Sequence, residues 1–411
     1  MGKINILGIN LNILSRTAVI KKIEEFLKDG KQHYIVTPNP EIVLKAQKDE
    51  EYFYIINKAD IQLMDGMGLK IAGWMMGKNI PRVTGADIVK DILKFCEEQK
   101  IKIAIVNKRG GLSDPEETSK ALKNQFPGLD FVIKEFNVNE DMFDYSQFNF
   151  FSPKIIFSAL GAPYQEKFIY HGLSRMPYAK LCLGIGGAFD FFTRKIKRAP
   201  KIFRVLGLEW FWRLINLPFY TDRLSRLKRI CAAIFIFPWK FIKWQYFLPF
   251  IYRPNVVGLL YKVENNKYYV LIVRRQGEKA HWQLPQGGVD GLSIEKAGTV
   301  ELNEELNNNR FKPAAVFKNL YKYKFNKAVN MHRAGVIKRH QGYRGQKQSL
   351  FIAEFIGEDS DIKVNFWDHD DWKWVESKKL VDSVHPTRQE ATKIFLNKFY
   401  EAADQKVHLL N

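Results

Sequence analysis

The stretch His33-Tyr34-Ile35-Val36-Thr37-Pro38-Asn39-Pro40-Glu41 decides how the first half of this chain is expected to fold. It begins with four residues that suit a short buried strand and then turns at once to polar residues and prolines. Similar strands, separated by helical patterns, are expected at Ile61–Met64, Ile101–Val106, Lys154–Leu160 and Lys180–Ile185. Strands that alternate with helices predict an α/β layered domain with a largely parallel sheet.

The residues on either side of this first strand fit the same plan. Residues 3–14 alternate apolar and polar positions and predict a hairpin or a pair of short strands. Ser15 is expected to cap a helix that Gly30 ends. A second helix is predicted from about Glu41 to Ala59.

Polar and glycine-rich segments follow several of the expected strands. They are TPNPE at 37–41, DGMG at 65–68, GAPYQE at 161–166 and GIGGAFD at 184–190, and RVTGAD at 82–87 precedes a helix. Open α/β sheets bind ligands beyond the carboxyl ends of their strands, and glycine-rich turns let backbone N–H groups approach a phosphate. One such Asp-Gly pair is more often an ordinary turn, but five segments together predict a ligand site.

In this order and spacing the five segments resemble the WecG/TagA/CpsF glycosyltransferase family. Arg198-Ala199-Pro200 and Gly207-Leu208-Glu209-Trp210, with Arg213-Leu214, extend the similarity over about residues 3–230. The resemblance implies a Rossmann-like layered domain. It also implies transfer, with inversion, of an N-acetylmannosamine-type sugar from a UDP donor to a polyprenyl-diphosphate-linked N-acetylglucosamine.

The resemblance also implies roles for single residues. An inverting transfer needs a base for the acceptor hydroxyl, and Asp65 matches the family's catalytic Asp. The residues expected to bind substrate are Thr37 and Asn39 in the sugar pocket, Arg82 and Gln165 at the diphosphate or sugar, and the glycine turn with Gly186 and Gly187. No Asp-x-Asp pair is present in these segments, so no cofactor is expected for this step. The segment 107–111 departs from the shorter glycine-rich turn usual in the family.

Residues 196–250 differ in composition from what precedes them. They hold eleven Lys and Arg against two acidic residues, a net charge of +9, with many aromatic residues between them. Such a segment suits the surface of an anionic membrane. Arg213 and Arg223 match the family's arginine-rich appendage and are expected to bind the acceptor diphosphate. The alternatives are a solvated basic face, a helical hairpin packed on the first domain, or a spanning helix over Cys231–Ile251 that Pro238, Lys240 and Lys243 would interrupt.

A new domain is expected to begin near residue 251, which divides the chain into 1–195, 196–250 and 251–411. Strands at Val256–Tyr261 and Tyr268–Arg274 are expected to pair across a turn, and a helix is expected from about Ser293 to Leu306. Further strands are predicted at Leu350–Phe355 and Trp372–Val375, and a closing helix from Arg388 to about Ala402. This order predicts an α+β domain.

Three carboxylates share one face of the expected helix 293–306. Glu301, Glu304 and Glu305 are spaced by three and four residues, and oxygen ligands favour Mg²⁺ or Mn²⁺. Three glutamates on a helix are usually a solvated face, but here the glycine-rich loop WQLPQGG (282–288) precedes them.

With the flanking segments, the second half resembles the Nudix hydrolases over about residues 251–395, and most closely the RNA pyrophosphohydrolase and dinucleoside-polyphosphate branch. The resemblance implies that Glu301, Glu304 and Glu305 hold the metal, that Glu304 and Glu305 are catalytic, and that Asp368 is a further acidic ligand. The implied substrate is a nucleoside diphosphate derivative or an RNA 5′ end.

The second half also departs from the Nudix pattern. Leu292 and Val300 stand where the family has a loop Glu and an Arg, and Asn307 replaces the terminal Gly. Loss of both members of an ion pair leaves no stranded charge, and Asn307 tolerates a left-handed helix cap. The alternative is a catalytically weak Nudix domain that serves as a nucleotide-binding regulatory module.

Composition limits the remaining classes of protein. A hydrophobic fraction of 46% supports ordered cores, and 411 residues suit two or three domains. The net charge of +20 predicts an anionic partner, so an RNA-binding protein is a further alternative. Cys96, Cys182 and Cys231 form no Cys-x-x-Cys pair, and no signal peptide precedes them. We therefore expect a cytoplasmic enzyme, peripheral on the inner face of the cell membrane.

Overall fold

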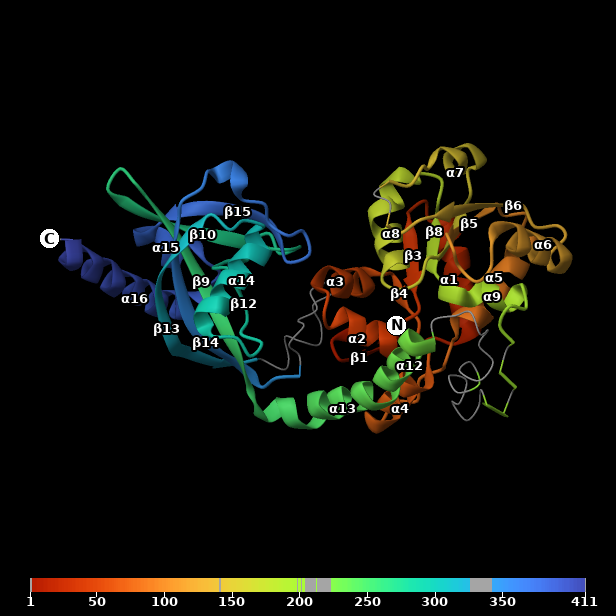
Figure 1. Cartoon of the computed structure of the whole chain (residues 1–411), viewed down its shortest axis with the longest axis horizontal. Helices are drawn as coiled ribbons and strands as arrows, with labels where there is room; N and C mark the ends of the chain where they lie inside the picture. Colours follow the sequence, from red (N-terminus) through yellow and green to blue (C-terminus); the bar gives the residue numbers. More distant parts are fainter. Residues whose placement is uncertain are drawn as a thin grey trace. The chain divides into compact units, whose positions relative to one another are not determined.

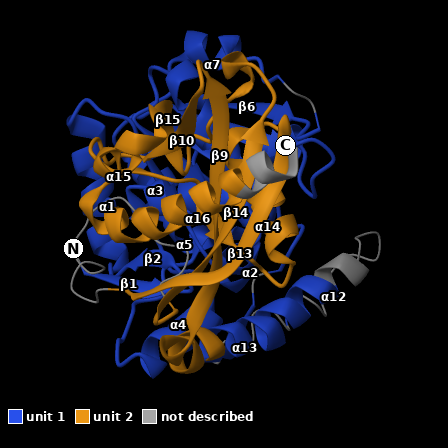
Figure 2. Ribbon diagram, turned by 90° about the vertical axis from the view of Figure 1, so that its left-hand side faces the viewer, with its two compact units in different colours: residues 1–242 blue, residues 243–411 orange. Residues whose placement is uncertain are grey.

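The computed structural model describes most of the chain, which forms two compact units. The described residues are 2–139, 142–197, 199, 200, 202, 203, 212, 223–325 and 342–410, with backbone alone for 223–226 and 405–410. The two units are Met1–Ile242 and Lys243–Asn411 (Figure 2). The basic segment 196–250 is thereby divided, because residues 243–250 belong to the second unit.

The first unit is built on a six-stranded sheet in which the described strand pairs are parallel (Figure 1). In spatial order the strands are β4 (Ile61–Gln62), β3 (His33–Val36), β8 (Leu181–Gly184), β7 (Ile155–Ala159), β5 (Ile103–Lys108) and β6 (Phe131–Phe136). The predicted parallel α/β sheet is confirmed, and β3 has the predicted bounds. Because the strands run in one direction, their carboxyl ends lie along one edge of the sheet.

Neighbouring residues of β3 pack on opposite faces of this sheet, since side chains alternate along a strand. Ile35 lies in the larger core with residues of α1 (Arg16–Lys28) and α5 (Gly85–Glu98). Tyr34 lies on the other face. Its ring meets that of Tyr170 in α8 (Tyr164–Gly172) edge-on at 6.4 Å, and its hydroxyl donates to the carbonyl of Ile55 in α3 (Glu50–Lys58). Helices thus cover both faces of the sheet.

The N-terminal elements are those expected, except that one predicted helix is divided into two. β1 (Lys3–Ile6) and β2 (Ile9–Asn12) form an antiparallel hairpin, and the Ser15 side chain accepts the N–H of Ala18 and caps α1. The single helix predicted over 41–59 is wrong. Two helices, α2 (Pro40–Ala46) and α3, replace it, because Asp49 accepts the N–H of Tyr52 and starts a new helix.

The described part of the basic segment is helical. α12 (Arg223–Cys231) leads into a π-helical stretch, Ala232–Ile236, and then into α13 (Phe237–Ile242). Phe237 is buried, and its ring lies against Gly68 in α4 (Met67–Met75). Within the described residues, no helix is both long and apolar enough to cross a bilayer.

The second unit is an α+β fold, as predicted, around a mixed sheet. The sheet runs in the order β11 (Trp282–Gln283), β10 (Lys267–Arg275), β9 (Tyr252–Glu264), β14 (Gly345–Phe355) and β13 (Phe311–Lys324), with β12 (Gln286–Gly288) on β9 and β15 (His369–Glu376) on β10. β14 is parallel to β9, and the other pairs are antiparallel. One face packs on α16 (Pro386–Leu410) and the other on α14 (Ile294–Leu306).

Two features of this unit show how local chemistry sets the fold. β9 and β10 are joined through Asn265 and Asn266, whose φ angles of 50° and 62° are left-handed, which suits a tight hairpin turn. α14 approaches the sheet closely at Gly298, because a Cβ there would lie 2.3 Å from Cγ of Phe351 in β14.

The close approach at Gly298 yields a stability prediction. Gly298→Ala should lower the free energy of unfolding by about 1–3 kcal/mol, because the added methyl group overlaps a buried ring that cannot move aside. Lys296→Ala, an exposed position on the same helix, is the control and should leave unfolding unchanged. Thermal unfolding of the full chain measures both, and an equally stable Gly298→Ala would show that this contact is not tight.

Candidate active sites

Asp65 lies at the carboxyl edge of the parallel sheet, three residues after the end of β4. Its backbone N–H donates to the carbonyl of Pro38 at 2.8 Å, and its Oδ2 accepts the N–H of Gly85 at 3.5 Å. The residue is half-buried. Gly66, at φ 91°, turns the chain from Asp65 into α4, and a Cβ there would lie 3.0 Å from the ring of Pro40. The backbone of Asp65 is therefore held against the segment that follows β3, and its carboxylate faces the start of α5.

That segment contains the two residues expected in the sugar pocket. The hydroxyl of Thr37 donates to the carbonyl of Gly184 at 3.3 Å and so joins the ends of β3 and β8. Asn39 caps α2, because its side-chain oxygen accepts the N–H of Ile42 at 2.9 Å. Thr37 is buried and Asn39 is half-buried. The structure thus brings both residues to the same strand ends as Asp65.

The side chain of Gln165 fixes the glycine turn by a hydrogen bond. Its side-chain oxygen accepts the N–H of Gly186 at 2.8 Å, and its Nε2 donates to Glu166 at 2.7 Å. Glu166 also accepts the hydroxyl of Tyr52 in α3 at 3.0 Å. All three side chains are buried. Gln165 therefore uses both ends of its amide within the protein, and Gly187 follows directly in the turn it holds.

Burial changes the chemistry of Glu166. Removal from water raises the pKa of its carboxyl group from 4.5 to about 7, although the hydrogen bonds from Gln165 and Tyr52 act in the opposite direction. Sequence reasoning placed Glu166 in a motif but gave it no role. Its burial could not be read from a strand-end position alone.

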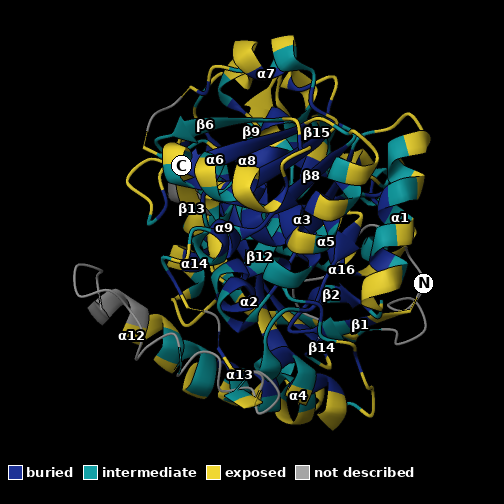
Figure 3. Cartoon of the chain, turned by 90° about the vertical axis from the view of Figure 1, so that its right-hand side faces the viewer, coloured by how far each residue is buried: buried dark blue, intermediate teal, exposed yellow. Residues whose placement is uncertain are grey.

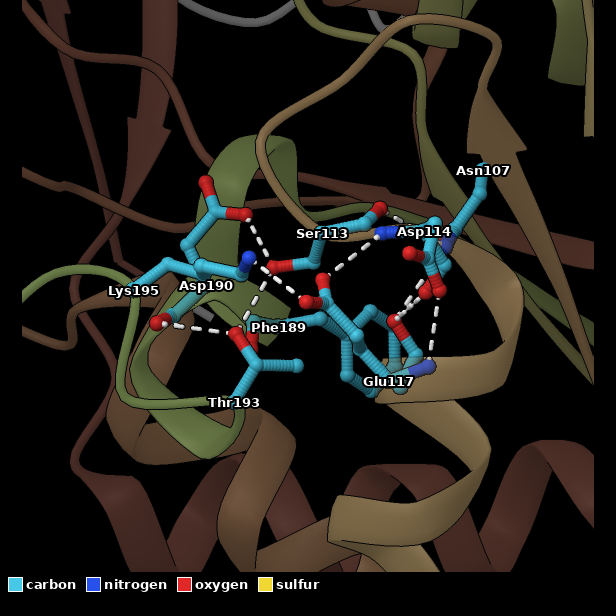
Figure 4. Close-up of polar contacts among 9 residues, drawn as sticks. Asn107, Ser113, Asp114, Glu117, Phe189, Asp190, Thr193 and Lys195 are labelled. Atoms are coloured by element: carbon cyan, nitrogen blue, oxygen red, sulfur yellow. Dashed lines mark hydrogen bonds and ion pairs between the residues drawn. The ribbon is translucent and has the colours of Figure 1, made fainter.

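A second polar cluster ties the loop after β5 to the residues after β8 (Figure 4). The hydroxyl of Ser113 donates to Asp190 Oδ1 at 2.7 Å and lies 2.7 Å from the hydroxyl of Thr193. Beside it, Lys195 pairs with Glu117 of α6 (Pro115–Gln125) at 2.5 Å. Residues 107–111, which differ from the shorter turn usual in the family, lead into this cluster. Sequence reasoning missed the cluster, although the Asp114–Glu117 capping box could have been recognised as the start of α6.

The expected arginine contacts fall in different places. Arg82 is half-buried and lies next to Val83, whose N–H bonds the carbonyl of Met64 at the end of β4. Arg213 lies outside the described residues. Arg223 begins α12, and only its backbone is described.

In the second unit, two of the three predicted carboxylates of α14, Glu301 and Glu305, lie against the glycine loop, and Glu304 is exposed. A Cβ at Gly287 would lie 1.7 Å from Glu301 Oε2, so only glycine fits there. Glu305 Oε1 accepts the N–H of Gln286 at 3.2 Å. Its Oε2 is buried without a hydrogen bond from any described residue, and His369 Nε2 lies 3.4 Å away.

These carboxylates raise one another's affinity for protons. The pKa of Glu301 is raised to about 8, mainly by burial and then by Glu305 and Glu304. Burial and then Asp368 raise the pKa of Glu305 well above its ordinary value, and the pKa of Glu304 is raised by burial with help from Asp290 and Asp368. A divalent cation would relieve this repulsion.

The oxygen donors of α14 suit a hard divalent cation. Among the described residues, no three acidic, histidine or cysteine side chains gather closely enough to hold a metal ion alone. An ion bound here would therefore complete its shell with water, a backbone carbonyl or substrate phosphate, as Mg²⁺ usually does.

The positions that depart from the Nudix pattern lie at the surface. Leu292 is 45% exposed and Val300 is 40% exposed. Asn307 takes the predicted left-handed conformation after α14, with φ 47°. The departures therefore leave the packing of α14 intact.

Two classes of domain follow from this geometry: a parallel α/β enzyme that binds substrate at the carboxyl edge of its sheet, and an α+β domain that presents helical carboxylates to a glycine loop. The chain belongs to the glycosyl transferase WecG/TagA/CpsF family, whose model matches residues 4–248. Residues 252–397 match the NUDIX domain. The chain is therefore a glycosyltransferase joined to a Nudix hydrolase domain.

The curated relatives agree with the first assignment. An N-acetylglucosaminyldiphosphoundecaprenol N-acetyl-β-D-mannosaminyltransferase of Bacillus spizizenii is 29% identical over 226 residues, which cover 53% of this chain and 85% of the relative. The enzyme of the same name from Staphylococcus aureus is 28% identical over 242 residues, covering 55% and 94%. Among solved structures, a C. elegans Ap4A hydrolase is 16% identical and covers 36% of this chain and 98% of its own, with a TM-score of 0.26.

The buried Glu166 yields a pH prediction. In the folded chain this carboxyl keeps its proton up to about pH 7, whereas an ordinary glutamate loses it near 4.5. The folded state therefore binds more protons between these values, and stability should fall as pH rises through them, by on the order of 3 kcal/mol.

Glu166→Gln should remove this contribution. The difference in unfolding free energy between the original chain and the variant should change between pH 4.5 and pH 7 and be flat above about 7. Chemical denaturation over this range measures it, with Glu116→Gln at an exposed position as the control. Parallel curves for the original chain and Glu166→Gln would contradict the buried, protonated state.

Proposed function

We propose that the first unit transfers an N-acetylmannosamine-type sugar, with inversion, from a UDP donor to a polyprenyl-diphosphate-linked N-acetylglucosamine. The observation that carries the proposal is the placement of Asp65, half-exposed at the carboxyl edge and bonded to both the Pro38 and Gly85 backbones. The relatives named for this transfer support the choice of sugar and acceptor.

Asp65 is the general base in this proposal. A carboxylate that takes the acceptor's hydroxyl proton makes the oxygen a stronger nucleophile toward the anomeric carbon, and the UDP leaves from the opposite side. Thr37 and Asn39 line the sugar, and Arg82 neutralises the leaving diphosphate. Arg213 and Arg223 bind the acceptor diphosphate. Because charge on the leaving group is met by arginine and by the backbone N–H group of Gly187, the transfer needs no metal.

Gln165 acts as a positioning residue in this scheme. Its buried amide holds the Gly186 N–H, and Glu166 and Tyr52 hold the amide in turn. The substrate then meets the glycine turn rather than the Gln165 side chain, which is 2% exposed.

The acceptor's lipid tail requires that the enzyme work at the cytoplasmic face of the cell membrane. The basic, aromatic segment 196–250 is the proposed docking element on anionic lipid, and the exposed Phe235 and Trp239 support this. RNA binding is the competing use of the +20 charge. It predicts salt-sensitive RNA binding by the full chain, whereas docking predicts co-sedimentation with anionic vesicles.

For the second unit we propose Mg²⁺- or Mn²⁺-dependent hydrolysis of a nucleoside diphosphate derivative or an RNA 5′ end. Glu301, Glu304 and Glu305 would hold the cation, which lowers the pKa of bound water and offsets phosphate charge. The buried Oε2 of Glu305 supports this, because no described residue donates a hydrogen bond to it and His369 Nε2 lies 3.4 Å away, so that a cation would stabilise it. In the second candidate function this unit binds nucleotide without hydrolysis and regulates the transferase, which the replacement of the family's Glu and Arg by Leu292 and Val300 favours.

Loss of the base should slow sugar transfer. Asp65→Asn should lower kcat by about 10²–10⁴-fold with little change in stability, because the amide keeps the shape but cannot take the proton. Transfer from a panel of UDP-N-acetylhexosamines to a lipid-diphosphate acceptor is the assay, and Asp130→Asn at an exposed position is the control. Undiminished transfer by Asp65→Asn would remove this residue as the base.

The two candidate functions of the second unit are separated by Glu304→Gln. Hydrolysis predicts Mg²⁺-dependent phosphate or nucleotide release by the full chain, reduced about 10²-fold or more in this variant and unchanged in Glu295→Gln on the exposed first turn of α14. Nucleotide analogues, dinucleoside polyphosphates and 5′-triphosphorylated RNA form the substrate panel. Tight nucleotide binding without release in any of them would establish the regulatory module instead.

A further inference from the structure

The helix that follows the proposed base is apolar on two opposite faces. Leu69, Ala72 and Gly73 of α4 are buried, and Gly73 lies so close to Ile80 that a Cβ there would be 2.7 Å from its side chain. Ile71, Trp74 and Met75, on the opposite face, are 47%, 49% and 45% exposed. A surface helix normally turns polar residues toward water, so this outer face calls for an apolar partner.

The charged residues of the segment that contains α4 all have one sign. Between Asp65 and Asp87 the sequence holds no acidic residue, but it holds Lys70, Lys78 and Arg82. Lys70 Nζ lies 5.0 Å from the centre of the Trp74 ring, so a cation sits at the rim of the apolar face. Aromatic and aliphatic side chains edged by lysines are typical of surfaces that enter the headgroup region of an anionic bilayer.

α4 is also continuous with the exposed aromatic residues of the basic segment. Phe237 of α13 packs on Gly68 of α4, and Figure 3 shows both helices side by side with exposed residues along them. Just before and after Phe237, Phe235 is 69% exposed and Trp239 is 63% exposed. The exposed aromatic residues around α13 thus follow α4 without a break, and Lys240 lies in α13 beside Trp239.

A second copy of the chain fits this face less well than a bilayer does. A two-fold contact would bring the same patch of both copies together and would gather two copies of Lys70 and Lys78 at one interface. Three half-exposed side chains are also few for a stable interface, which buries about 800 Å² on each partner.

We propose that the outer face of α4, formed by Ile71, Trp74 and Met75, inserts into the anionic membrane as a contact separate from the 196–250 segment. The inference rests on the proposed membrane-bound acceptor. α4 begins two residues after Asp65 and spans about 12 Å at 1.5 Å per residue. Seating this helix at the headgroups holds the base near the level at which a lipid-linked diphosphate presents its sugar.

The test is co-sedimentation of the full chain with vesicles of phosphatidylcholine and phosphatidylglycerol, without substrate. Trp74→Ser and Ile71→Ser should each weaken binding by about tenfold. Phe150→Ser, which removes a 95% exposed aromatic residue from α7 (Ser146–Phe151), should leave binding unchanged. Trp239→Ser reports on the appendage alone. Loss of binding in Trp239→Ser with none in the two α4 variants would overturn the proposal and leave the proposed function intact.

A second measurement does not depend on the loss of a side chain. With Cys231→Ser as background, a polarity-sensitive dye at Met75→Cys should shift to the blue on these vesicles, and the same dye at Phe150→Cys should not. An unchanged spectrum at position 75 would refute the insertion. A fall in the mass of the chain in sedimentation velocity on Trp74→Ser, without vesicles, would refute it in favour of self-association.

Discussion

The first active site depends on one buried chain of hydrogen bonds that joins two helices to the end of β8. Tyr52 in α3 and Gln165 in α8 both donate to Glu166, and the Gln165 oxygen in turn receives the N–H of Gly186. Glycine turns are intrinsically free to adopt many conformations, and ordering one costs more entropy than ordering any other residue. The hydrogen bond from the Gly186 N–H to the buried Gln165 amide offsets this entropy cost, because it favours one orientation of the turn. The glycine turn at the end of β8 thereby takes one fixed conformation.

Sequence patterns predicted several of the parallel strands and the polar turns that follow them. Each of these patterns is local, because it consists of a few apolar residues followed directly by a turn. They failed where a longer-range or competing signal decided. Asp49 capped a new helix inside the predicted 41–59 helix, since a carboxylate at that point satisfies a backbone N–H better than continued helix does. The strand β13 went unpredicted because its burial alternates weakly and much of it is exposed, so its pairing with β14 rather than its own pattern defines it.

The candidate sites were predictable to a similar degree. Thr37, Asn39 and Asp65 could be placed together because parallel strands end at one edge, and the spacing of Glu301, Glu304 and Glu305 fixed their shared helical face. What side chains do inside the protein was not readable. Gln165 reads as a polar residue free for a ligand, yet its partners Glu166 and Gly186 come from contacts that the sequence does not display. The same holds for Ser113 and Asp190, which lie 77 residues apart.

The departures of the Nudix domain can be reconciled with a retained metal site by the exposure of the positions involved. An ion pair at positions as open to solvent as Leu292 and Val300 would contribute little to stability, so its loss leaves the fold unchanged. The carboxylates behave differently, because Glu305 is buried beside the loop that Gln286 begins and Glu301 touches Gly287. A chain that had no use for a cation would gain stability by replacing these mutually repelling groups with amides or apolar residues. The presence of all three glutamates, together with Gly287, which leaves room for the Glu301 side chain, therefore favours an ion-binding domain more than the changes at 292 and 300 oppose it.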